Sequence, residues 1–163
     1  MFSLKEINFK TMYDFRNRPK DNYIHHANWK QLFILTEYWK SDLLFYQDDL
    51  KFLHHLIDKY FLLISKKDNV DKVLEIEVNL LNVDKQCASL LKKTNKHLQY
   101  LAELIDNPFA YDAHKFKIEH EILEDSLAQF VKDFRNNRKE VFRITEYIMD
   151  HEQLVHQLNT VNK

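Results

Sequence analysis

Two histidines, His120 and His151, fall at positions of the chain where a repeating apolar pattern predicts core residues. Glu119, Glu124 and Glu152 lie beside them in the sequence, and Glu124 stands one helical turn after His120, on the same face of a helix. Imidazole and carboxylate groups that converge inside a helical bundle are a known arrangement of metal ligands. These five residues therefore form a candidate metal site, for which iron, zinc or manganese would be the cofactor.

The candidate metal site requires the chain to turn between its two histidines. With a turn at Asn136-Asn137, His120 and His151 would be offset by two residues, or about 3 Å along neighbouring antiparallel helices. The same layer would also hold side chains from the earlier helices: Thr94, and Trp39 or Thr36. A buried polar layer that sets the helix register explains these residues without a metal, because Thr and Glu can satisfy buried imidazoles. We favour that interpretation, and the Glu-x-x-His motif of di-iron bundles is absent from the sequence.

A second group of candidate residues is aromatic. Tyr38, Phe45 and Phe52 follow one another at intervals of seven residues, which places them on one face of the first long helix, beside its main apolar stripe. Two interpretations remain open for this aromatic stripe. It is either buried between two neighbouring helices of the same chain or exposed as a contact surface for another subunit.

The elements that position these residues are long helices. The chain has 163 residues and no Gly, so Gly-rich phosphate loops are excluded as motifs, and β architectures that rely on positive-φ hairpin turns are disfavoured. Asn28 and Gln31 have the spacing of a capping box at the start of a helix. Asn107-Pro108 predicts the start of a later helix, because Asn is a good cap and Pro is tolerated in the first helical turn.

Apolar residues then recur at alternating steps of three and four in each predicted helix. In the first helix the stripe runs from Trp29 to Ile64. In the second, a stripe that starts at Val70 and another that starts at Val73 fit equally well. His97 lies off the first of these stripes, so we expect it to be exposed to solvent.

The last part of the chain permits two folds. Asn137 and Glu140 have capping-box spacing, which favours a break at Asn136-Asn137 and an antiparallel, up-and-down four-helix bundle. The apolar phase nevertheless continues through Asn137, which would give a three-helix bundle with one continuous C-terminal helix. We favour the four-helix bundle for residues 28–163, preceded by a leader over 1–27 that includes a short helix.

Charge and composition narrow the function. The net charge is −1, from 24 basic and 25 acidic residues. The chain therefore lacks the surplus of basic residues that binding to nucleic acid would require, and we expect no nucleic-acid partner. A single Cys, no apolar signal segment at the N-terminus and no apolar run of membrane-spanning length favour a soluble, cytoplasmic protein. We find no sequence motif typical of a catalytic site. We therefore expect a non-catalytic bundle that binds a protein partner or itself, with a metal-binding bundle as the alternative.

Overall fold

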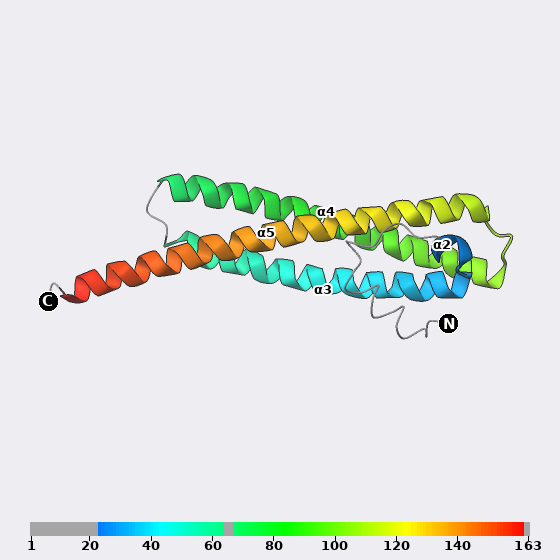
Figure 1. Cartoon of the computed structure of the whole chain (residues 1–163), viewed down its shortest axis with the longest axis horizontal. Coiled ribbons are helices and arrows are strands. Elements are labelled where there is room, and N and C mark those ends of the chain that lie inside the picture. The colour runs from blue at the N-terminus through cyan, green and yellow to red at the C-terminus, as the bar shows by residue number, and fades with distance from the viewer. Residues whose placement is uncertain (1–22, 64–66, 162–163) are drawn as a thin grey trace. The chain divides into compact units, whose positions relative to one another are not determined.

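The computed structural model describes residues 23–63 and 67–161 of the chain. A four-residue helix, α2 (Tyr23–His26), is followed by three long helices: α3 (Trp29–Phe61), α4 (Lys67–Asp106) and α5 (Ala113–Val161) (Figure 1). These described residues form helices and no strands, which confirms the all-α prediction. The predicted helix within the first 22 residues lies outside the described part of the chain.

The start of α3 confirms the predicted capping box. The Asn28 backbone N–H donates to Oε1 of Gln31 at 2.9 Å, and the Gln31 backbone N–H donates to Oδ1 of Asn28 at 2.8 Å. The two side chains thus satisfy two amides that have no partner within the helix.

The start of α5 lies five residues later than the sequence predicts. The Asn107 side chain accepts the Phe109 backbone N–H at 3.1 Å, so it stabilises a turn rather than capping a helix. Asp112 is the cap instead, because its Oδ1 accepts the Lys115 backbone N–H at 2.9 Å.

The predicted break at Asn136-Asn137 is wrong. One helix, α5, runs from Ala113 to Val161 and is drawn as an uninterrupted ribbon from yellow-green to red (Figure 1). Asn137 does not cap a new helix, since its Nδ2 donates to the Asp133 carbonyl one turn earlier at 2.9 Å. The three long helices therefore match the three-helix alternative and not the favoured four-helix bundle.

The chain divides into two compact units, and each long helix contributes one segment to each unit. Unit 1 comprises the described residues up to Leu44 together with Cys87–Lys132. Its core includes a cluster of five buried residues from α3, α4, α5 and the residue before the first cap: Ala27, Leu32, Leu101, Leu104 and Phe116. The Trp29 ring meets the Phe116 ring edge-on, with 5.6 Å between their centroids, so α3 and α5 are in direct contact in this unit.

Unit 2 comprises Phe45–Gln86 and the described residues from Asp133 onward. Its buried residues follow the heptad pattern on all three helices: Leu50, Leu53 and Ile57 on α3, Val73, Ile76, Leu80 and Val83 on α4, and Phe134, Val141 and Ile148 on α5. The Tyr46 ring packs against the Phe134 ring with 4.7 Å between centroids. The α4 residues show that the stripe starting at Val73 is the buried one.

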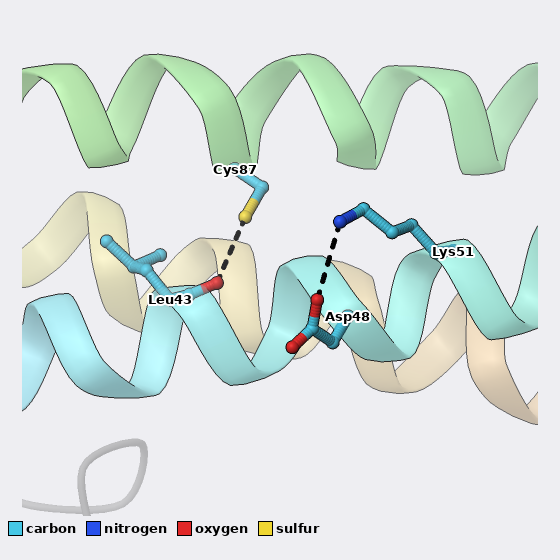
Figure 2. Close-up of polar contacts among 4 residues, drawn as sticks. All are labelled: Leu43, Asp48, Lys51 and Cys87. Carbon is cyan, nitrogen blue, oxygen red and sulfur yellow. Dashed lines mark hydrogen bonds and ion pairs between the residues drawn. The ribbon is translucent and has the colours of Figure 1, made fainter.

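Two polar contacts of α3 illustrate the difference between buried and exposed positions (Figure 2). In unit 1, the Cys87 thiol of α4 is buried and points toward the Leu43 carbonyl of α3, with 3.5 Å between sulfur and oxygen. In unit 2, Lys51 and Asp48 form an exposed ion pair along α3 at 3.5 Å. Cys87 is therefore a small core residue, as its place on an apolar face predicts.

No helix in the described part of the chain combines the length and the apolar character that crossing a membrane requires.

Candidate functional site

The most unusual polar feature of unit 1 is a pair of buried histidines. His97 comes from α4 and His120 from α5, and they are 6% and 0% exposed. Their side chains lie 2.7 Å apart, between Nε2 of His97 and Nδ1 of His120. At this distance one neutral ring donates its N–H to the unprotonated nitrogen of the other.

Aromatic rings enclose the histidine pair on two sides. The Trp39 ring of α3 packs on the His120 ring, with 4.7 Å between centroids and an interplanar angle of 32°. The Phe116 ring stacks on the His97 ring at 4.4 Å and 14°. Among the described residues, Nε2 of His120 has no hydrogen-bond partner. The pair is therefore held by apolar packing and by one hydrogen bond between its own members.

Two buried threonines of the same unit behave differently. Thr36 and Thr94 are each 0% exposed. The Thr36 hydroxyl donates to the Leu32 carbonyl at 2.7 Å, which is the usual bond of a buried Thr within a helix. The Thr94 hydroxyl has no hydrogen-bond partner in the described part of the chain. Polar residues thus occupy core positions of α3 and α4 here, but only one hydroxyl is satisfied by the protein itself.

Burial keeps both imidazoles neutral. It lowers the pKa of His97 from 6.5 to about 4. It also lowers the pKa of His120 from 6.5 to about 3, and the charge of His97 contributes to this second shift. A proton on either ring would be buried among apolar side chains, where a charge is unfavourable. At neutral pH both rings are therefore uncharged, and the pair forms a hydrogen-bonded polar layer in the core of unit 1.

The structure does not bring the candidate metal site together. His120 and His151 belong to one continuous helix, and their separation of 31 positions corresponds to about 46 Å of helix. His151 and Glu119 are exposed, Glu124 is half-buried, and the Glu152 side chain lies outside the described residues. Among the described residues, no group of three or more His, Cys, Asp or Glu side chains is placed to hold a metal ion.

Sequence reasoning missed His97, which is buried rather than exposed. The reason is the phase of the α4 stripe. Continued at steps of three and four, the stripe that starts at Val73 passes through Leu90, Thr94, His97 and Leu101, all of which are buried. That stripe alone would have placed His97 in the core. The predicted layer is correct in part, since Trp39 and His120 are in contact.

The aromatic stripe of α3 is exposed. Tyr38 lies on the part of α3 that belongs to unit 1 and is 40% exposed, while Phe45 and Phe52 lie in unit 2 and are 63% and 55% exposed. The Phe45 ring meets the ring of its neighbour Tyr46 edge-on, with 6.0 Å between centroids. Burial between neighbouring helices of the same chain is therefore not the explanation for these rings.

Comparison with protein-family models, with curated proteins and with solved structures finds no match to this chain.

Proposed function

We propose that this protein acts through protein–protein association and that the aromatic stripe of α3 is its contact surface. The observation that carries the proposal is the exposure of two Phe rings, Phe45 and Phe52, at 63% and 55%. They stand seven residues apart in unit 2 and so lie on one face of α3.

The chemistry of the surface supports this proposal. Full burial of a large aromatic side chain removes about 150–250 Å² of mostly apolar area from water, and burial of apolar area is the dominant favourable contribution to association. More than half of each residue's area remains exposed at Phe45 and Phe52. Aromatic side chains are also enriched at the centres of protein interfaces. The exposed apolar positions of α3 extend beyond the two Phe rings and include Ile34 and Tyr38, which are 49% and 40% exposed. A helix that presents such residues at heptad spacing is suited to contact another helix.

The partner that the experiment tests first is a second copy of the chain. The net charge of −1 gives little repulsion between copies, so it does not oppose self-association. In a symmetric dimer each α3 would supply the same rings, so the interface would contain Phe45 and Phe52 from both subunits.

The test compares Phe45→Ser/Phe52→Ser with wild type by sedimentation equilibrium and by chemical unfolding. The double variant should be monomeric where the wild type associates. Its unfolding free energy should change by only about 1 kcal/mol in total, because exposed positions contribute little to the fold. Phe109→Ser is the matched control, since Phe109 is 92% exposed and lies in the connection between α4 and α5.

Two results would contradict the proposal. The first is a wild-type protein that stays monomeric at every concentration tested and from which no specific partner co-purifies. The second is a double variant that unfolds, because the rings would then belong to the core. Equal loss of association in Phe109→Ser would show that the effect is not specific to α3.

A further inference from the structure

A polar groove lies in unit 2, where α4 and α5 face each other. Its volume is about 280 Å³. The lining residues from α4 are Asn79, Asn82, Val83 and Gln86. The lining residues from α5 are Asp133, Asn136, Asn137 and Glu140. We call this feature the amide groove, because five of its eight lining side chains are carboxamides.

The two helices contribute to the amide groove with the same spacing. On each helix the lining residues stand at positions i, i+3, i+4 and i+7, which is one face of a helix. A face that meets another helix in a bundle is normally apolar. Here Val83 is the only apolar residue of the eight, and Asn82, Gln86 and Asn136 are exposed. The groove is therefore a polar, solvent-facing feature beside the apolar core of unit 2.

Asn137 is the buried polar residue of this lining. It is 9% exposed and occupies a core position of α5, in phase with Phe134 and Val141. Its Nδ2 donates to the Asp133 carbonyl, but its Oδ1 finds no hydrogen-bond donor among the residues that the structure describes. A buried carbonyl oxygen without a donor is unfavourable, and a ligand with N–H or O–H groups would remove that penalty.

The charges of the lining residues narrow the class of ligand that the amide groove can bind. Asp133 and Glu140 are acidic, and the eight lining residues include no Lys, Arg or His. Nε2 of Gln86 donates to Oδ2 of Asp133 at 3.2 Å, which holds one carboxylate in place across the two helices. Carboxylate and amide oxygens are acceptors, so the groove favours a cation that carries several donors.

The size of the amide groove favours an organic cation over a metal ion. A volume of about 280 Å³ is close to the lower end of the range for small-molecule sites. No cluster of three or more metal-type ligands occurs in the described residues. We propose that the amide groove binds a small aliphatic amine, whose ammonium groups pair with Asp133 and Glu140 and whose N–H groups reach the carboxamide oxygens.

The experiment titrates the full chain with spermidine by calorimetry and follows the side-chain amide resonances of Asn79, Asn82 and Asn137 by NMR. Triethylene glycol is the neutral probe and calcium chloride the metal probe. Spermidine should bind with defined stoichiometry and shift these amide resonances. In Asp133→Asn/Glu140→Gln the affinity should fall by about tenfold or more, as expected when charge-assisted hydrogen bonds are lost.

A matched variant separates the groove from general charge attraction. Glu146→Gln/Asp150→Asn removes the same two negative charges from exposed positions of α5 and should bind spermidine like the wild type. Asn137→Leu should remove binding while the helical content stays unchanged.

The proposal is overturned if spermidine does not bind or if the two charge variants weaken binding equally. It is also overturned if calcium or triethylene glycol shifts the groove resonances and spermidine does not.

Discussion

The buried histidine pair predicts that lowering the pH destabilises this protein. His97 and His120 have native pKa values of about 4 and about 3, whereas the ordinary value is 6.5. The unfolded chain therefore binds protons more readily than the native chain as pH falls below 6.5. The stability that the neutral pair contributes is fully present above that value. It is lost progressively as pH falls toward the native values.

The magnitude follows from the size of the shifts. At pH 5 the solution is 1.5 pH units below the ordinary value of 6.5 and still above both native pKa values. Each unit corresponds to about 1.4 kcal/mol, so each histidine costs about 2 kcal/mol of unfolding free energy and the pair about 4 kcal/mol. Small domains have about 5–15 kcal/mol in total, so this loss is a large fraction of the stability.

The assay is urea unfolding at pH 7 and at pH 5, followed by circular dichroism, for wild type and for His97→Phe/His120→Phe. Replacing both members of a buried hydrogen-bonded pair by apolar groups of similar shape leaves no unpaired partner behind. The double variant should therefore fold, and it should lose about 4 kcal/mol less than the wild type between the two pH values.

The control for the histidine pair is His114→Gln, because His114 is exposed. Its pH dependence should follow the wild type. If the double variant showed the same pH dependence as the wild type, the two rings would not be buried as neutral groups and the reasoning would be refuted. A clearly shallower dependence in His114→Gln would refute the assignment to the buried pair.

Four further substitutions test the packing and the cap of α5. Thr94→Val should be neutral or stabilising by about 1 kcal/mol, because the buried Thr94 hydroxyl has no hydrogen-bond partner among the described residues. Thr36→Val loses a hydrogen bond and should cost about 1 kcal/mol. Urea unfolding of both variants would contradict this reasoning if the order of stability were reversed. Asp112→Ala should cost about 1 kcal/mol through loss of the α5 cap, and hydrogen exchange at Lys115 should quicken, so unchanged protection there would argue against the cap. Phe130→Ala should cost about 3–5 kcal/mol because Phe130 is 1% exposed, and a loss below about 1 kcal/mol would show that this ring is not packed in the core.

The candidate sites were predictable from the sequence to different degrees. The aromatic stripe of α3 could be recognised from its spacing, but not its exposure, because spacing shows which residues share a face and not what covers that face. The buried histidine pair was half predictable. His120 stands on an unambiguous stripe of α5, whereas His97 stands on one of two equally good stripes of α4.

One part of the amide groove, Asn136-Asn137, is conspicuous in the sequence, but its local pattern predicts a turn and not a groove. Asn136-Asn137 read as a turn, because Asn favours caps and turns when only local interactions are considered. In the structure Asn137 is inside α5 and lines a groove opposite polar residues of α4. The polar positions on α4 and α5 predict a groove only when the two helices are known to lie side by side.

Local interactions account for what the sequence determined by itself. The absence of Gly, the apolar steps of three and four and the Asn28–Gln31 capping box act over a few residues, and they were sufficient to predict an all-α chain and the start of α3. Tertiary structure alone decided the continuity of α5, the phase of the α4 stripe and the pairing of His97 with His120. These features depend on contacts between helices that are distant in sequence, and burial against a neighbouring helix outweighs a local preference for a cap or a turn.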